Sequence, residues 1–161
     1  MIFVTVGTHE QSFNRLIKKI DELKELGVIE EDVIIQKGYS TYEPKFCTCF
    51  DLIPWEEVQR LNREARIIIT HGGPASFIDI LSLGKTPIVV PRQSKFNEHV
   101  NDHQLEFSLA LKNKGENIIV IENIDDLQSA ITNYENQVSE YRSNNKRFVN
   151  ELTEAVRRMF R

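Results

Sequence analysis

The residues best suited to chemistry follow an apolar segment in the middle of the chain. Ile67 to Ile69 predicts a buried strand, His71-Gly72-Gly73 comes soon after it, and Pro74 opens an amphipathic helix. Glycines let a backbone approach a ligand closely, and the first N–H groups of a helix attract an anion. Ser76 adds a hydroxyl in the first turn, and Asp79 adds a carboxylate on the same face. This pattern predicts a seat for a diphosphate, with a carboxylate placed to bind a ribose diol.

A second polar group follows the next apolar strand. Ile88 to Val90 lies between two prolines, and the polar residues after it are Glu98, His99, Asn101, Asp102, His103 and Gln104. If both strands are parallel, the two polar groups meet at one edge of a sheet. That edge would suit a ligand with a nucleotide at one end and a polyol at the other. A plain helix start with a capping serine is the simpler alternative for the first group alone.

Strands and helices alternate along most of the chain. The apolar patterns predict strands at 2–6, 32–36, 46–50, 67–70, 88–90 and 117–121, and helices at 12–26, 54–64, 74–83 and 101–112. Such alternation predicts an α/β fold, in which right-handed crossovers build a parallel sheet with helices on both faces. Gly7 to Gln11 and His71 to Ser76 both fall at carboxyl ends of strands, where ligands bind on such sheets.

Composition narrows the class of protein. The chain has 161 residues, which suits one domain, and its net charge of −4 argues against a dedicated nucleic-acid binder. We expect no transmembrane helix, since no apolar run approaches about 18 residues, and no secretory signal. Cys47 and Cys49 lack the second ligand pair that a zinc site needs, so we expect reduced thiols on a strand of a cytoplasmic protein.

The last part of the chain predicts helices with an apolar seam. The seam residues are Leu127, Ile131, Tyr134, Val138, Tyr141, Asn145, Phe148, Leu152, Ala155 and Met159. Two interpretations stay open: the helices pack back on the sheet, or part of the seam docks on another chain. The basic residues from Tyr141 onward are Arg142, Lys146, Arg147, Arg157, Arg158 and Arg161. They predict a solvated helix face or a contact with an anionic membrane or acidic partner.

These motifs resemble a known family. The arrangement of His71, Gly73, Ser76, Asp79, Gly84, Pro87, Asp102 and Gln104 is similar to the donor-nucleotide motif of GT-B glycosyltransferases, in particular the C-terminal domain of the MurG-like family 28. VTVGTHEQSFNRLI and PRQSKFNEHVNDHQ resemble small bacterial members used in capsule and exopolysaccharide synthesis. Those members are similar to the dolichol-pathway subunit that binds UDP-N-acetylglucosamine. The resemblance implies a Rossmann-like domain over residues 1–125, equivalent to the donor-binding half of a GT-B enzyme, with residues 126–161 as its helical extension.

The resemblance also implies roles for matching residues. His71, Gly72, Gly73 and Ser76 would hold the diphosphate, near Gly7 and Thr8 of the first loop. Asp79 stands where the family has a ribose-binding Glu. The positions expected near the donor sugar are Asn101, Asp102 and Gln104, and those expected near uracil are Ile53 and Trp55.

The reaction needs a general base for the acceptor hydroxyl. His9 and Glu98 are the candidates in this chain, and a partner residue is a third. His9 could instead contact phosphate or be an ordinary loop histidine. No D-x-D stands where it could bridge a metal to the diphosphate, so we expect no metal and no cofactor, with UDP-sugar as the donor substrate.

One Rossmann-like half implies a missing acceptor half. We therefore expect the donor-binding subunit of a two-component hexosyltransferase, which acts with a membrane-associated subunit on a lipid-diphosphate-linked acceptor at the inner face of the membrane. A homodimer stays open, and no nucleic acid is expected. The alternative is a nucleotide-sugar-binding regulatory subunit that enhances a partner without catalysing transfer. A free-standing epimerase or hydrolase is disfavoured by the half-sized chain.

Overall fold

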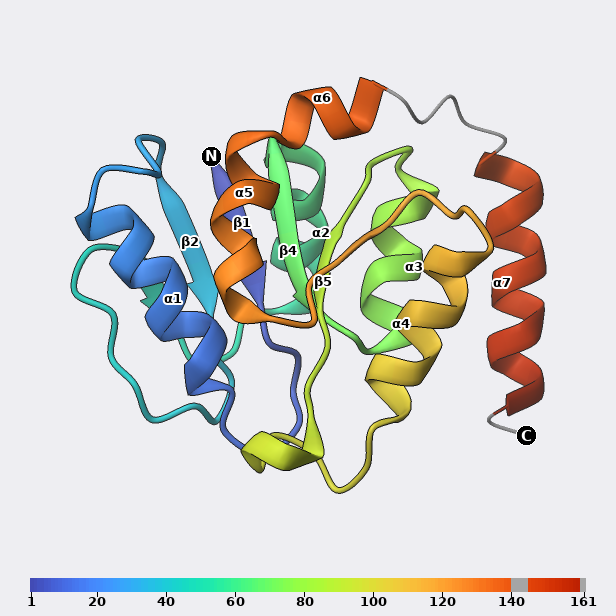
Figure 1. Cartoon of the computed structure of the whole chain (residues 1–161), viewed down its shortest axis with the longest axis horizontal. Coiled ribbons are helices and arrows are strands. Elements are labelled where there is room, and N and C mark those ends of the chain that lie inside the picture. Colours follow the sequence, from blue (N-terminus) through green and yellow to red (C-terminus); the bar gives the residue numbers. More distant parts are fainter. Residues whose placement is uncertain (140–144, 160–161) are drawn as a thin grey trace.

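A six-stranded parallel sheet forms the centre of the computed structural model, which describes residues 1–139 and 145–159 (Figure 1). Its strands are β1 (Ile2–Thr5), β2 (Val33–Gln36), β3 (Thr48–Phe50), β4 (Ile67–His71), β5 (Ile88–Val90) and β6 (Ile119–Val120). The helices are α1 (Asn14–Glu25), α2 (Trp55–Glu64), α3 (Pro74–Ser82), α4 (His103–Asn113), α5 (Leu127–Thr132), α6 (Tyr134–Ser139) and α7 (Asn145–Met159). The prediction of a Rossmann-like parallel sheet with helices on both faces is confirmed.

The order of the strands creates the place where a ligand can bind. The sheet runs β3-β2-β1-β4-β5-β6, so the chain moves outward in one direction from β1 and in the other from β4. The loops after β1 and β4 therefore diverge, and they leave a crevice at the carboxyl edge of the sheet. This edge lies away from the N-terminus, at the bottom of Figure 1.

The boundaries of these strands and of helices α1 to α4 differ from the expected ones by two residues at most. Helix α4 begins at His103 because the preceding loop is held by its own side chains: Asn101 Oδ1 accepts the His103 N–H at 3.1 Å. A short 3₁₀ helix, Ser94–Phe96, was not predicted from the sequence. It ends at Asn97 in a left-handed conformation, with φ of 57°, which asparagine tolerates better than most residues.

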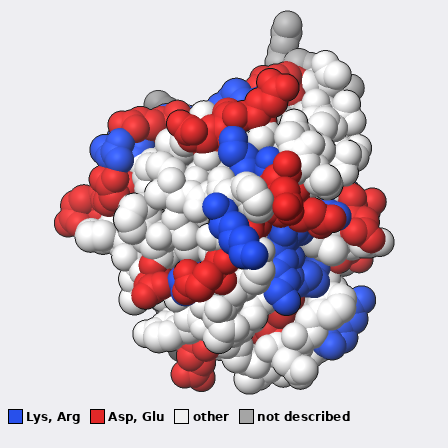
Figure 2. All heavy atoms as spheres, turned by 90° about the vertical axis from the view of Figure 1, so that its left-hand side faces the viewer, with Lys and Arg blue, Asp and Glu red and all other residues white. Residues whose placement is uncertain are grey.

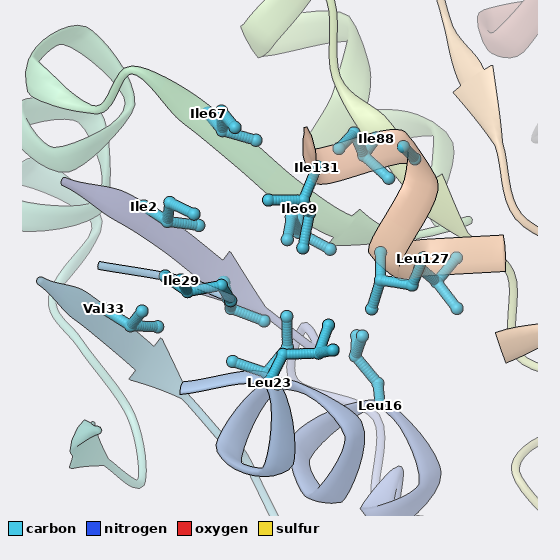
Figure 3. Packing of buried hydrophobic residues seen from close by; sticks show 14 of the residues in the cluster. Ile2, Leu16, Leu23, Ile29, Val33, Ile67, Ile69, Ile88, Leu127 and Ile131 are labelled. Carbon is cyan, nitrogen blue, oxygen red and sulfur yellow. The ribbon is translucent and has the colours of Figure 1, made fainter. Parts of the chain in front are cut away.

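Two apolar clusters fill the two faces of the sheet. Alternate residues of a strand point to opposite faces, so Ile2 and Val4 enter one cluster and Phe3 the other. Helices α1 and α5 cover the first cluster, which Figure 3 shows between Leu16 of α1, Leu127 of α5 and the strand residues Ile2 and Ile69. Helices α2, α3 and α4 cover the second. Burial on both faces explains why the strands read as continuous apolar runs.

The C-terminal helices pack back on this domain wherever the structure describes their side chains. Leu127, Ile131 and Tyr134 belong to the first cluster, and Leu152 of α7 belongs to the second. Helix α7 lies against α3. The seam is therefore at least partly intramolecular. Tyr141, Arg142 and Arg161, which the docking interpretation also used, lie outside the described residues.

The face of the molecule in Figure 2 carries charges of both signs. Acidic and basic side chains are interspersed on the face at the α1–β2 end of the molecule, around an uncharged area (Figure 2).

Cys47 and Cys49 are free, and burial raises the pKa of the first thiol to about 12 and of the second to about 11. Both thiols therefore stay protonated and weakly nucleophilic near neutral pH. Within residues 1–139 and 145–159, no helix is both long and apolar enough to cross a bilayer.

Replacing Leu152 with alanine tests whether α7 belongs to the core. Its side chain is only 4% exposed, so Leu152→Ala should leave a cavity beside α3 and lower the free energy of unfolding by about 2–4 kcal/mol. Met159→Ala, at an exposed position of the same helix, is the control and should change stability by less than about 0.5 kcal/mol. Equal denaturation midpoints for the two variants would contradict this packing.

Candidate active site

A cavity of about 710 Å³ opens at the carboxyl edge, between the loops that follow β1 and β4. Helices α2 and α3 form its side walls, and Val156 of α7 also lines it. It brings together ten of the residues that sequence analysis selected: Gly7, Thr8, His9, Ile53, Trp55, His71, Gly73, Ser76, Asp79 and Gln104. The sequence therefore identified much of this wall.

Three selected side chains make loop contacts and do not line the cavity. The Asp102 carboxylate accepts both the N–H and the hydroxyl of Ser94, at 2.8 and 2.9 Å, and these bonds lower its pKa. Asn101 caps the N–H of His103. The Glu98 carboxylate accepts from Arg15. In this conformation Asp102 and Asn101 shape the loop before α4, and their predicted contact with a sugar would require them to exchange partners.

The expectation that Glu98 acts as a general base does not fit the structure. Glu98 is buried, and its two oxygens accept from Arg15 Nε at 2.7 Å and Nη2 at 2.9 Å. The same carboxylate accepts the Gln93 N–H at 3.0 Å. A base must present a free lone pair to the substrate. Glu98 instead forms a paired buried carboxylate, whose removal would leave Arg15 without its partner.

His71 is enclosed by two glycines. A Cβ on Gly7 would lie 2.4 Å from His71 Nε2, and one on Gly73 would lie 2.1 Å from its Cε1. Gly7 also has a φ of 76°, which side chains rarely permit. Burial, helped by the charge of Arg92, lowers the pKa of His71 to about 3. The imidazole is therefore neutral at physiological pH.

The hydrogen bonds of His71 determine its tautomer. The Gly73 N–H donates to Nδ1 at 3.0 Å, so Nδ1 carries no proton. Nε2 therefore carries the ring proton and donates it to Ser76 Oγ at 3.0 Å. Because Ser76 accepts this bond, its own hydroxyl proton is left for a ligand. The N–H of Ala75, in the first turn of α3, has no intrahelical acceptor and also lies at the cavity wall.

A buried arginine behind the cavity was missed by the sequence analysis. Arg92 has no exposed surface, and its guanidinium donates to the carbonyls of Val6, Gln11 and Glu98 at 2.8, 2.7 and 3.0 Å. Burial lowers its pKa to about 10, so it remains cationic near neutral pH. An arginine in a polar loop is usually exposed, and only the fold shows that it ties the β1 and β5 loops together.

His9 is oriented by Gln11 and His99. His9 Nε2 lies 2.9 Å from Gln11 Oε1, while Gln11 Nε2 donates to the Asn97 carbonyl at 3.3 Å. The second contact fixes which end of the amide faces His9, so Nε2 of His9 must carry its proton. The imidazole of His99 stacks on that of His9 at 4.5 Å between centroids. Nδ1 of His9 is the nitrogen left to accept a proton.

Gln104 and Asp79 complete the walls. Gln104 Oε1 accepts the N–H groups of Gly72 and Arg92 at 3.1 and 3.2 Å, which couples the loops after β4 and β5. Asp79 accepts from Gln59 of α2 at 3.1 Å. In the part of the chain that the structure describes, no group of three or more histidine, cysteine or acidic side chains is arranged to hold a metal ion.

Solved structures to which this chain is similar include two larger glycosyltransferases. The glycotransferase of kitacinnamycin superposes with a TM-score of 0.58 at 16% identity, over 86% of this chain and 37% of that one. The glycosyltransferase SnogD from Streptomyces nogalater gives a TM-score of 0.47 at 18% identity, over 96% and 43%. A flavodoxin-like domain from Synechococcus gives 0.49 at 11%, over 88% and 100%. At such identities, the first match shows the fold alone.

This chain thus spans about two fifths of the length of those two glycosyltransferases. A comparison with curated proteins found no match. The family model of the glycosyltransferase family 28 C-terminal domain, however, matches residues 1–159, which includes the C-terminal helices. With this match and the sheet described above, the chain belongs to the family of glycosyltransferase family 28 C-terminal domains and has the fold of the C-terminal half of GT-B enzymes.

Proposed function

We propose that this protein is the donor-binding subunit of a two-component glycosyltransferase that uses a UDP-sugar. The observation that carries the proposal is the start of α3, where the Ser76 hydroxyl and the Ala75 N–H line the cavity; we call these two groups the anion seat. The cavity lies between β1 and β4, where the strand order of this family 28 domain reverses direction. Ser76 and the free N–H of Ala75 would bind the diphosphate. Asp79, one turn further along the same helix, would bind the ribose diol.

Three features favour diphosphate binding without a metal ion. The dipole of α3 places partial positive charge at the seat. Arg92 supplies a buried positive charge behind the loop after β1. His71 offers its only ring proton to Ser76 and thereby directs the Ser76 hydroxyl proton toward the ligand. These groups would stabilise the charge that grows on the leaving diphosphate.

In the transfer step, His9 would act as the general base. The acceptor hydroxyl oxygen attacks the anomeric carbon while the bond from that carbon to the diphosphate oxygen breaks. The bonding electrons leave with UDP, and Nδ1 of His9 takes the hydroxyl proton before releasing it to solvent. Inversion at the anomeric carbon follows from a single displacement. The prearranged His9 favours a catalytic subunit over one that only regulates a partner.

The acceptor would come from a second subunit. The chain holds one Rossmann-like half, and positioning two substrates is worth many kcal/mol in catalysis. We therefore propose a membrane-associated partner that holds a lipid-diphosphate-linked acceptor for capsule or exopolysaccharide synthesis. Binding to that partner would place this chain at the inner face of the membrane. If the partner alone transfers the sugar and this chain only accelerates it, the regulatory alternative holds.

UDP should bind the isolated chain in the presence of EDTA. Ser76→Ala should weaken this binding by about 1–2 kcal/mol, because it removes one hydrogen bond to a charged oxygen. Ser82→Ala, at the other end of α3, is the matched control and should leave affinity unchanged. Isothermal titration calorimetry measures both effects. No binding at millimolar UDP, or binding only with added divalent ions, would contradict the proposed seat.

His9→Ala should lower kcat of the two-subunit enzyme by about 100-fold or more, since it removes the base. UDP affinity should change little. Gln11→Leu should also lower kcat without raising KM for the donor, and ¹⁵N NMR should show that His9 no longer holds its proton on Nε2 alone. Gln128→Leu, an exposed position on α5, is the control. A wild-type His9 protonated on Nδ1, or full activity of His9→Ala, would refute this assignment.

A further inference from the structure

Strand β3 forms an open edge of the sheet. It stands at one end of the strand order, and within residues 1–139 and 145–159 no strand pairs with its outer side. Phe50 is 51% exposed at this edge, and Phe46, just before the strand, is 45% exposed. Figure 2 views this end of the molecule and shows an uncharged area with charges around it. An uncovered edge with exposed apolar side chains favours pairing with another strand.

The backbone of this edge is held in place by its own domain. The Phe50 carbonyl accepts the N–H of Lys37, which follows β2, at 2.9 Å, so the polar groups of Phe50 face β2. Successive residues of a strand direct their N–H and C=O groups to alternate sides, so those of Cys49 face outward. Asp21 of α1 accepts the Phe46 N–H at 2.8 Å, which ties the preceding segment to the domain. The outer edge is therefore preformed for a further strand.

The sequence of this edge is symmetrical about Thr48. Residues 45–51 read Lys-Phe-Cys-Thr-Cys-Phe-Asp, so Cys and Phe recur at equal spacing on either side of Thr48, and the two ends carry opposite charges. In an antiparallel pair with a two-fold axis at Thr48, position 46 meets position 50 and position 45 meets position 51. Aromatic ring then meets aromatic ring, and Lys45 meets Asp51. The Asp51 side chain is 79% exposed and thus accessible, although Lys37 Nζ lies 3.2 Å from it.

We propose that two copies of this chain form a two-fold dimer by antiparallel pairing of their β3 edges. Thr48 of one copy lies opposite Thr48 of the other without mutual hydrogen bonds, because its N–H and C=O groups face β2. Cys47 of each copy exchanges both backbone N–H···O=C bonds with Cys49 of the other, once the strand extends back to residue 46. The same patch is used on both copies, and two six-stranded sheets join into one.

The aromatic side chains of the pair would lie on the face that α2 covers. A groove of about 520 Å³ lies beside Phe50 on that face, and Ile34 and Leu52 are among the residues that line it. This groove would receive the Phe46 ring of the second copy, so that the exposed apolar residues of the edge become buried. The two carboxyl edges point to opposite ends of the joined sheet, and each copy keeps a separate cavity. The inference therefore goes beyond the proposed donor site and does not rest on it.

Analytical ultracentrifugation of the full chain from about 1 µM to about 1 mM tests the dimer, at low ionic strength to limit screening. Lys45→Glu places like charges opposite each other at both ends of the pair, and so does Asp51→Lys. Each variant alone should therefore associate about tenfold or more weakly than the wild type. An equimolar mixture of the two variants should recover the wild-type association, because both ends of the mixed pair then join a carboxylate to an ammonium group. Lys112→Glu, an exposed position on α4, is the matched control and should leave association unchanged.

Recovery in the mixture supports this register, since another surface would not respond to the exchange of charges. A wild-type chain that stays monomeric throughout overturns the proposal. So does a dimer that both variants leave intact, or a mixture that associates no better than its components.

If either variant fails to fold, amide hydrogen exchange of the wild-type chain decides. The Cys49 N–H faces the second copy and should exchange about tenfold or more slowly at the high concentration than at the low one. The Phe50 N–H faces β2 and should exchange equally at both concentrations. Equal exchange of Cys49 at the two concentrations overturns the proposal.

Discussion

The buried guanidinium of Arg92 holds the carboxyl edge of the sheet together. It donates to the carbonyls of Val6 and Gln11, which belong to the loop after β1, and to Glu98 in its own loop. A buried cation is unfavourable unless its surroundings compensate it. These carbonyls and the Glu98 carboxylate, itself paired with Arg15, provide that compensation. The network fixes two of the loops that border the cavity before any ligand arrives.

The site depends on that fixed edge. Gly7 lies against His71 in the loop after β1, whose carbonyls at Val6 and Gln11 accept from Arg92, and the buried imidazole stays neutral. A neutral His71 can accept from Gly73 and donate to Ser76 at once, which orients the Ser76 hydroxyl. Gln11 is held by the same arginine through its carbonyl and in turn orients His9. One buried charge thus supports both the anion seat and the proposed base, so little reorganisation is needed when a substrate binds.

Local sequence patterns predicted the elements well because strands buried on both faces and amphipathic helices leave clear signatures. His71, Ser76 and Asp79 were identified because they follow one strand at helical spacing. The contacts of Arg92 and Gln11 were not predicted, since they join distant segments: Arg92 donates to the carbonyl of Val6, and Gln11 donates to that of Asn97. The pairing of Glu98 was missed for the same reason, because its partner Arg15 lies on another element. Sequence spacing shows which residues share a strand end, and only the fold shows which are already paired.

A crystal structure of the chain with UDP tests the central claim most directly. The account predicts a diphosphate oxygen within hydrogen-bonding distance of Ser76 Oγ and the Ala75 N–H, with the ribose hydroxyls at Asp79. It also predicts that His71 keeps its contact with Ser76. A nucleotide bound elsewhere, or one whose diphosphate does not contact the start of α3, would contradict the assignment of this cavity as the donor site.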